Sequence, residues 1–198
     1  MNDMDNELWK SVDDYVVSKL LDDDPALTDA LARNSEGGLP AIDVSRTQAE
    51  LLAILIRMSG ARRVLEVGTL GGFSTIAMAR ALPPGGLVTT LELLPEHAEV
   101  AAANVAAAGL SDVVSFGVGP AIELLDAMLD DPPEPFDFTF IDADKPNSPE
   151  YFKRAMKLSR PGATIIVDNV VRGGSLADAT SDDAGTVGNR QLHDEIAE

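Results

Sequence analysis

Apolar residues recur at helical spacing through the first sixty residues of the chain. One face of a predicted helix carries Leu8, Trp9, Val12, Tyr15, Val16 and Leu20. Pro25 ends this pattern, and the turn-rich stretch NSEGGLPAID follows. A second helix is predicted to begin after Ser45 and to extend through Met58, because Ser45 and Gln48 have the spacing of a capping box and Gly60 closes the pattern.

Short apolar runs then alternate with helical patterns. We predict strands over residues 63–68, 87–93, 113–118, 136–141 and 163–167. We predict the intervening helices over residues 74–82, 95–108, 121–129 and 149–158. Strands that alternate with helices in this way predict an α/β fold with a doubly wound, mainly parallel sheet of the Rossmann-like type and right-handed crossovers.

The organisation expected is one domain over residues 1–198. Residues 1–43 form a helical segment on the substrate side, and residues 44–170 form the core. Residues 171–198 are glycine-, serine- and aspartate-rich at their start, so we expect a mobile loop over 172–188 and a short helix from Asn189.

The amino-acid composition and net charge exclude several kinds of site and ligand. The chain of 198 residues has no cysteine, which excludes disulfides, a thiolate metal site and a cysteine nucleophile. Its net charge of −18 disfavours nucleic acid and anionic membranes as partners and favours a cationic small ligand. No apolar run approaches the roughly 18 residues of a membrane span, and the first residues do not resemble a signal peptide. We therefore expect a soluble, cytoplasmic protein.

The stretch VLEVGTLGGFST, residues 64–75, predicts a strand, a glycine-rich turn and a helix N-terminus. A dinucleotide-binding turn places its first glycine where this chain has Glu66. A carboxylate there would oppose a pyrophosphate, so NAD and FAD are disfavoured, whereas a ligand with an ammonium or sulfonium group meets no such conflict. The alternative is an ordinary turn between a strand and a helix.

Glu92 ends the second predicted strand, where an acidic side chain can accept hydrogen bonds from ribose hydroxyls. S-adenosylmethionine (SAM) fits both features, because it is a nucleoside without phosphates that carries a sulfonium. Its carboxylate could use the helix N-terminus and the Ser74 hydroxyl. The alternative for Glu92 is a surface carboxylate.

Polar residues also follow the fourth and fifth predicted strands. If these strands are neighbours, about 4.8 Å apart, Asp142, Asp168 and Asn169 converge on one place. Two carboxylates and an amide suit Mg²⁺, or Mn²⁺ or Ca²⁺, rather than zinc. The alternative is that these residues are helix caps and turn residues.

Lys145 is a candidate general base, because a nearby cation and a partly buried cofactor would destabilise its ammonium form. The alternative is a surface lysine paired with Asp144. His97 and His193 are expected to be surface residues on helices, outside any cluster.

Five stretches in this order resemble the cation-dependent O-methyltransferases related to caffeoyl-CoA and catechol O-methyltransferase, a group of class I SAM-dependent enzymes. They are LPAIDVSRTQ, VLEVGTLGGFST, TLELLPEHAEVAAAN, FIDADKPN and IIVDNVVRGG, within about residues 41–174. The resemblance implies that SAM is held by Glu66, Gly68, Ser74 and Glu92, lined by Val44 and Ala121, and that Asp142 is shared between SAM and the metal. It also implies Asp142, Asp168 and Asn169 as metal ligands and Lys145 and Asp142 as catalytic residues.

By the same resemblance, the metal binds two vicinal hydroxyls of an aromatic small molecule and acidifies one for attack on the sulfonium methyl, and the enzyme is a homodimer. Three departures matter. Ser148 stands where plant members have an aromatic residue, so the packing on the substrate side is expected to differ. The acidic chain has no evident clamp for coenzyme A, which favours a small catechol-like acceptor. No final antiparallel strand pair is predicted from the sequence. A noncatalytic or truncated SAM-binding module remains the main alternative, ahead of an NAD-type oxidoreductase.

Overall fold

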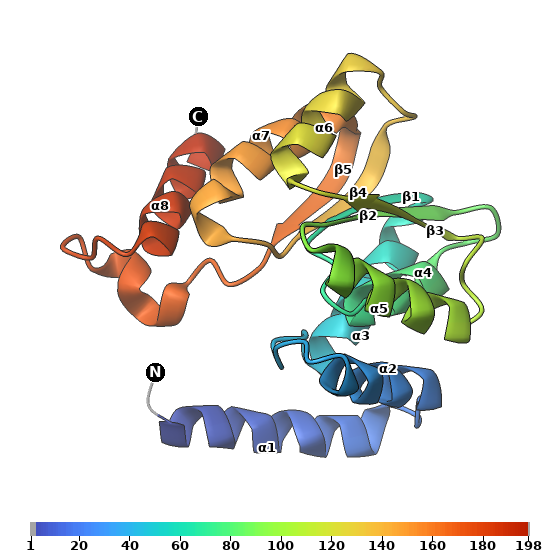
Figure 1. Ribbon diagram of the computed structural model, residues 1–198. Helices are drawn as coiled ribbons and strands as arrows, with labels where there is room; N and C mark the ends of the chain where they lie inside the picture. Colours follow the sequence, from blue (N-terminus) through green and yellow to red (C-terminus); the bar gives the residue numbers. More distant parts are fainter. Residues whose placement is uncertain (1–2, 198) are drawn as a thin grey trace.

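A five-stranded parallel sheet forms the centre of the molecule (Figure 1). The computed structural model describes residues 3–197, with side chains from Glu7 onwards. The strands are β1 (Arg63–Val67), β2 (Leu87–Glu92), β3 (Val114–Val118), β4 (Phe136–Ile141) and β5 (Ser159–Val167). Their order is β3-β2-β1-β4-β5, and every neighbouring pair is parallel. The chain changes direction across the sheet between β1 and β4, which is where open α/β sheets bind ligands.

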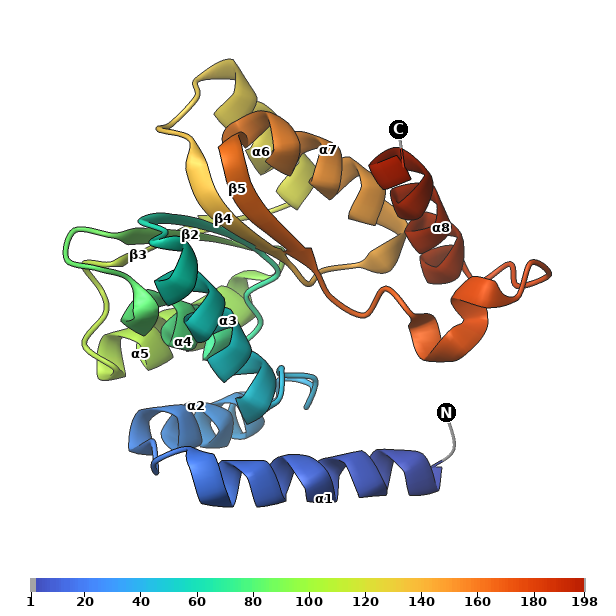
Figure 2. The same cartoon turned by 180° about the vertical axis from the view of Figure 1, so that it is seen from behind.

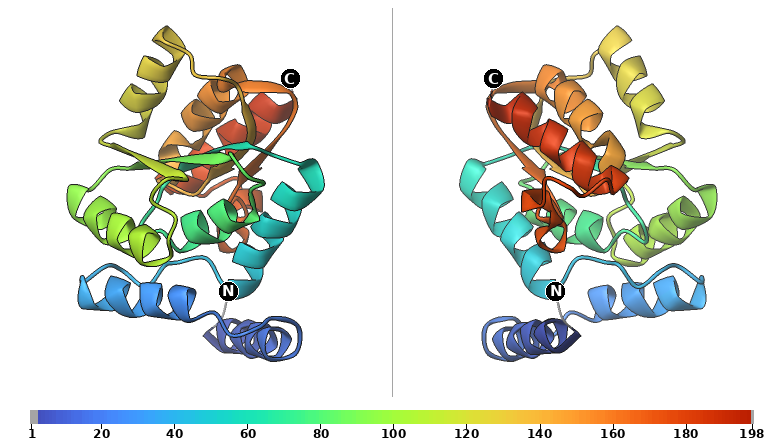
Figure 3. Two further views of the ribbon diagram at one scale, coloured as in Figure 1. Left: turned by 90° about the vertical axis from the view of Figure 1, so that its right-hand side faces the viewer. Right: turned by 90° about the vertical axis from the view of Figure 1, so that its left-hand side faces the viewer.

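Helices cover both faces of the sheet (Figures 1 and 3). One face carries α3 (Arg46–Ser59), α4 (Phe73–Ala81) and α5 (Pro95–Ala107), and the other carries α6 (Ala121–Asp130) and α7 (Ser148–Leu158). Because side chains alternate along a strand, Val64 of β1 joins the core under α3 and α4, and Leu65 joins the core under α6 and α7. The predicted fold class is confirmed.

The N-terminal segment contains α1 (Asp3–Leu20) and a helix that the sequence pattern did not predict, α2 (Pro25–Glu36). Pro25 was interpreted only as the end of the first helix. It is instead the first residue of α2, where the missing N–H costs nothing, and Oδ1 of Asp24 accepts a hydrogen bond from the Leu27 amide at 3.2 Å. The predicted capping box of Ser45 and Gln48 is present at the start of α3.

The C-terminal segment is more regular than expected. Residues 172–188 were predicted to form a mobile loop, but they contain the short helix η2 (Arg172–Ala177) and the first turns of α8 (Ala184–Ala197). Asp183 caps α8 by accepting a hydrogen bond from the Thr186 amide at 2.8 Å. Arg190 bonds to carbonyls of the preceding segment, those of Ser175, Leu176, Asp178 and Ser181. The glycines of α8 hid its start, because glycine lowers helix propensity.

β5 is the last strand on its side of the sheet, and the described residues include no antiparallel strand (Figure 2). Within residues 3–197, no helix is both long enough and apolar enough to cross a membrane.

Candidate active site

A cavity of about 740 Å³ opens beside the carboxyl ends of the central strands. It contains the predicted site residues Val44, Gly68, Ser74, Glu92, Ala121, Asp142, Lys145, Asp168 and Asn169. Glu66 is the predicted residue that does not line it. The fold therefore brings residues from six separate stretches of the chain to one cavity.

Glu66 is buried beneath the cavity rather than in its wall. Its side chain has no exposed surface, and it accepts hydrogen bonds from the hydroxyls of Ser74 at 2.5 Å, Thr90 at 2.7 Å and Thr75. Burial raises the pKa of Glu66 to about 7, and the three hydroxyls oppose that rise. The carboxylate fixes Ser74 at the start of α4, and Ser74 is the residue that faces the cavity.

The glycine-rich turn lies directly against the end of β4. Gly68 has a φ of +97°, and a side chain on it would overlap the carbonyl oxygen of Asp142. Its amide donates a 2.9 Å hydrogen bond to the Leu91 carbonyl of β2. Glycine is required here because only a residue without Cβ permits both this conformation and this close approach.

Glu92 connects the end of β2 to the same turn. Its Oε2 accepts hydrogen bonds from the amides of Thr69 at 3.1 Å and Leu70 at 2.8 Å, and its Oε1 accepts one from the Leu94 amide at 3.1 Å. The carboxylate is almost fully buried, yet it lines the cavity. The alternative of a surface carboxylate is wrong.

His97 was expected to be a surface residue outside any cluster, and this prediction is wrong. Its side chain is 16% exposed, lines the cavity and places Nδ1 3.6 Å from Oε1 of Glu92. The available signal was position, since His97 lies in the first turn of the helix that begins at Pro95, just after Glu92. His193 is an exposed residue of α8, as expected.

Asp142 and Asp168 follow neighbouring strands, as the metal hypothesis requires. The Asp142 amide donates to the Val67 carbonyl at 2.8 Å, and the Asp168 amide donates to the Ile141 carbonyl at 3.0 Å. Asn169 has a φ of +54°, and its amide donates to Oδ1 of Asp168 at 2.6 Å. Burial raises the pKa of Asp168, and the nearby Asp142 charge acts in the same direction.

Two carboxylates and an amide at one wall of the cavity are a donor set that fits a hard divalent cation. Residues 3–197 contain no group of three or more acidic or histidine side chains placed to hold a metal, so any site here depends on the Asn169 amide.

Lys145 lies in the short helix η1 (Lys145–Asn147), and its Nζ is 2.6 Å from Oδ1 of Asp142. The alternative pairing with Asp144 is wrong. Asp144 instead accepts hydrogen bonds from Asn147 Nδ2 at 2.7 Å and from the Tyr151 hydroxyl. Ser148 is buried and does not line the cavity, whereas Tyr151, one turn further along α7, does.

Three further cavity residues were not predicted. Gln48, besides capping α3, places Nε2 3.4 Å from Oδ2 of Asp168. Tyr151 supplies an aromatic wall. Asp43 is half-buried, which raises its pKa, and it accepts a 2.9 Å hydrogen bond from Asn34 Nδ2. No local pattern marks these residues as part of a site, although Gln48 belongs to the predicted capping box, because they come together only when distant segments pack.

The parallel sheet and the cavity at its carboxyl edge define a Rossmann-like class I methyltransferase fold. A family model described as O-methyltransferase matches residues 18–198. The catechol O-methyltransferase of Mycobacterium tuberculosis is 50% identical over 180 residues, which are 91% of this chain and 80% of that protein. The catechol O-methyltransferase of Niastella koreensis is 44% identical over 190 residues, 96% of this chain and 86% of that protein.

Solved structures agree. The O-methyltransferase from Bacillus cereus, in complex with S-adenosylhomocysteine (SAH), has a TM-score of 0.95 and 48% identity over 96% of this chain and 87% of that chain. An O-methyltransferase from Streptomyces achromogenes involved in tomaymycin synthesis, in complex with SAM, has a TM-score of 0.92 and 46% identity over 96% of this chain and 86% of that chain. The protein belongs to the O-methyltransferase family, and the resemblance to its catechol and caffeoyl-CoA types is confirmed.

Proposed function

We propose that the protein transfers the methyl group of SAM to one hydroxyl of a small catechol-like acceptor, with the help of a divalent cation. The observation that carries the proposal is the shared cavity. It joins the glycine turn and Glu92 at one end to Asp142, Lys145, Asp168 and Asn169 at the other. SAM can therefore lie at the first end of the cavity, beside an acceptor at the second end. The hydroxyls of the acceptor would face the oxygen atoms of Asp142, Asp168 and Asn169.

SAM is the cosubstrate that best fits the first end of the cavity. The turn presents Gly68 and Ser74, and Glu92 lies where ribose hydroxyls can donate to it. The Asp142 backbone lies against Gly68 and the residue lines the cavity, so we assign its carboxylate to the cationic amino-acid portion of the ligand. The complexes of two relatives with SAH and SAM support this assignment. Glu66 contributes from below by fixing Ser74.

The residues that would hold the cation are Asp142, Asp168 and Asn169, with Mg²⁺ preferred over Mn²⁺ or Ca²⁺. Such a cation supplies a Lewis acid that lowers the pKa of a neighbouring hydroxyl. Lys145 would take the proton from that hydroxyl as the neutral amine and so become the ammonium, and its Nζ lies beside Asp142, a proposed ligand of the cation, at 2.6 Å from Oδ1. The cavity wall would orient the acceptor oxygen towards the methyl group. Orientation of the reactants lowers the activation barrier by several kcal/mol, as it does in intramolecular reactions.

A catechol-like acceptor is preferred to a coenzyme A ester for two reasons. The net charge of −18 opposes a polyanionic tail, and the relatives from M. tuberculosis and N. koreensis are named catechol O-methyltransferases. Tyr151 and Phe73 give the cavity aromatic surface against which a planar ring can pack.

The deciding experiment is transfer of labelled methyl from SAM to a panel of catechols, with Mg²⁺ and again with EDTA. Turnover that EDTA abolishes and added Mg²⁺ restores is the expected result. Turnover that EDTA does not change would remove the metal from the proposal. Cofactor binding without turnover on any catechol would favour the noncatalytic SAM-binding module, which is the second candidate.

A homodimer also stays a prediction. Exposed apolar side chains on α1, among them Trp9 and Tyr15, give it physical support, because exposed patches of this kind often lie in interfaces. Light scattering coupled to size exclusion at several concentrations tests it.

A further inference from the structure

The helix α8 contacts both segments that carry the proposed metal ligands and base, although it contributes no residue to the cavity. Its buried face consists of Gly185, Thr186, Gly188, Asn189 and Leu192. Gly185 and Gly188 on this face lie against Lys145 and Pro146, and the Asn189 side chain contacts the backbone of Asn169.

Gly188 lies on the backbone of η1. A side chain at this position would overlap the Lys145 carbonyl oxygen and would come within 2.8 Å of Pro146 Cα. Gly185, one turn earlier, would bring a Cβ within 3.2 Å of Lys145 Cβ. The helix backbone is therefore in direct van der Waals contact with the residue that carries the proposed base.

Asn189 lies next to Gly188 and contacts the other segment. Its side chain has no exposed surface, and its Nδ2 donates a 3.3 Å hydrogen bond to the carbonyl oxygen of Asn169. Asn169 has a φ of +54°, a left-handed conformation that asparagine adopts more readily than most residues, and the bond from Asn189 holds its carbonyl in this turn. Among the described residues, Asn189 Oδ1 has no hydrogen-bond partner. The bond from Nδ2 to the Asn169 carbonyl is therefore the interaction that the Asn189 side-chain amide makes there.

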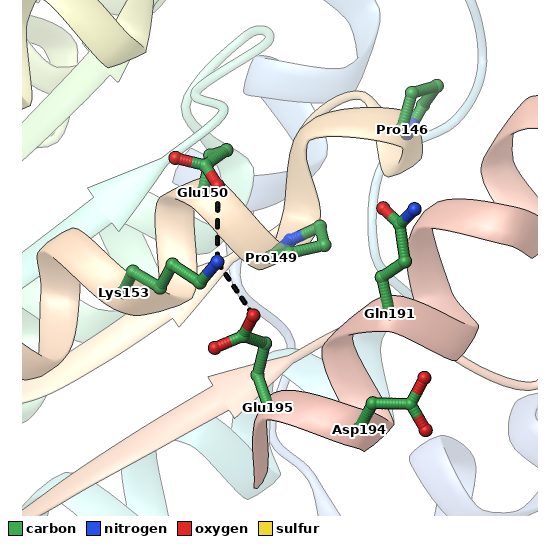
Figure 4. A pocket seen from close by; sticks show the side chains of 7 residues that line it. All are labelled: Pro146, Pro149, Glu150, Lys153, Gln191, Asp194 and Glu195. Atoms are coloured by element: carbon green, nitrogen blue, oxygen red, sulfur yellow. Dashed lines mark hydrogen bonds and ion pairs between the residues drawn. The ribbon is translucent and has the colours of Figure 1, made fainter.

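The far end of α8 is fixed to α7 (Figure 4). Lys153 of α7 places Nζ 2.7 Å from Oε1 of Glu195 and 3.4 Å from Oε1 of Glu150. In Figure 4, Gln191 of α8 lies on the side that faces Pro146 and Pro149, at a small cavity of about 320 Å³. The helix thus packs against α7 as well as against η1 and η2.

We propose that Asn189 is a positioning residue, which holds the Asn169 turn in the conformation that presents the ligand set, while Gly188 fixes the Lys145 backbone on the same helical turn. One helix thereby sets the distance between the base and the metal ligands. The inference rests on the proposed metal site. Partners that orient metal ligands typically change metal affinity about 10–100-fold when they are lost.

The test compares Asn189→Ala with Thr186→Ala in the full chain. Thr186 is a matched control, because it is equally buried on the same face but bonds to Ser175 and Asp183 instead of Asn169. Binding of Mn²⁺ alone is measured by electron paramagnetic resonance, and binding of SAH by calorimetry. Hydrogen exchange of peptides that cover residues 168–174 reports the turn itself.

Asn189→Ala is expected to weaken Mn²⁺ binding about 10–100-fold, to speed exchange in residues 168–174 and to leave SAH affinity unchanged. Thr186→Ala is expected to lower the melting temperature without weakening Mn²⁺ binding. Equal loss of Mn²⁺ affinity in both variants, or wild-type affinity in Asn189→Ala, would overturn the proposal. If the wild-type chain binds no Mn²⁺, the metal site of the proposed function fails, and unchanged exchange in Asn189→Ala would then overturn the positioning role separately.

Discussion

Nζ of Lys145 lies 2.6 Å from Oδ1 of Asp142, and both side chains lie at the wall of the cavity where the glycine turn meets β4. This contact joins the proposed base to the residue proposed to serve both cosubstrate and cation.

Replacing Lys145 by methionine should lower kcat by about 100-fold or more, because the acceptor hydroxyl loses its proton acceptor. The affinity for SAH should be unchanged, since the glycine turn and Glu92 remain. Initial rates with a catechol at saturating Mg²⁺, over pH 6–9, measure the effect. Lys157→Met, an exposed lysine near the end of α7, is the control. An unchanged kcat and pH profile would exclude Lys145 as the base.

Replacing Glu92 by glutamine should weaken SAH binding by about 10–100-fold, equivalent to about 1.5–3 kcal/mol for lost charge-assisted hydrogen bonds. The amide would turn an NH₂ group towards backbone N–H donors of Thr69, Leu70 or Leu94. Calorimetric titration with SAH measures the loss. Glu96→Gln, exposed on the next helix, should bind as the wild type does. Equal affinities in both variants would mean that Glu92 does not organise the cofactor end.

The buried carboxyl of Glu66 should make stability depend on pH. Its folded pKa of about 7 lies above the ordinary glutamate value of 4.5, so the folded state binds more protons between these values and stability falls as the pH rises through them. The contribution is about 3 kcal/mol between pH 4.5 and pH 7. Glu66→Gln should therefore lose less stability than the wild type between pH 5 and pH 8.

Urea unfolding of the apo protein at both pH values measures this difference. Glu123→Gln, an exposed position on α6, controls for the general effect of removing one charge from an acidic chain. The same pH dependence in the two variants would show that Glu66 titrates normally.

Gly71→Ala should destabilise the protein by about 3 kcal/mol, because the new Cβ would overlap the Asn34 amide. Asn34 belongs to a buried set of hydrogen bonds in which Asn104 Nδ2 donates to Asn34 Oδ1 and to the Gly71 carbonyl, each at 2.9 Å. In an Asn34→Ala background the same substitution should cost much less. A double-mutant cycle by chemical denaturation gives the coupling, and additive costs would contradict the overlap.

Much of the fold could be predicted because its signals are local. The capping box of Ser45 and Gln48, the glycine turn and the alternation of strands and helices each depend on residues close together in the chain. The helix α2 was missed although its signal was local too, since Asp24 and Pro25 form an N-terminal cap. The start of α8 was missed because its glycines serve packing rather than helix propensity.

In the candidate site, too, some features could be predicted from the local sequence and others only from the tertiary structure. The sequence determined which strand ends carry chemistry, because parallel strands deliver their carboxyl ends to one edge and the residues after them can be identified by spacing alone. Tertiary structure decided how each residue is used. It turned Glu66 away from the cavity and under Ser74, brought His97 to Glu92 and Gln48 to Asp168, and laid α8 against Lys145 and Asn169. These relationships join residues far apart in the chain or depend on which face of an element is buried, and both are fixed only when the helices pack.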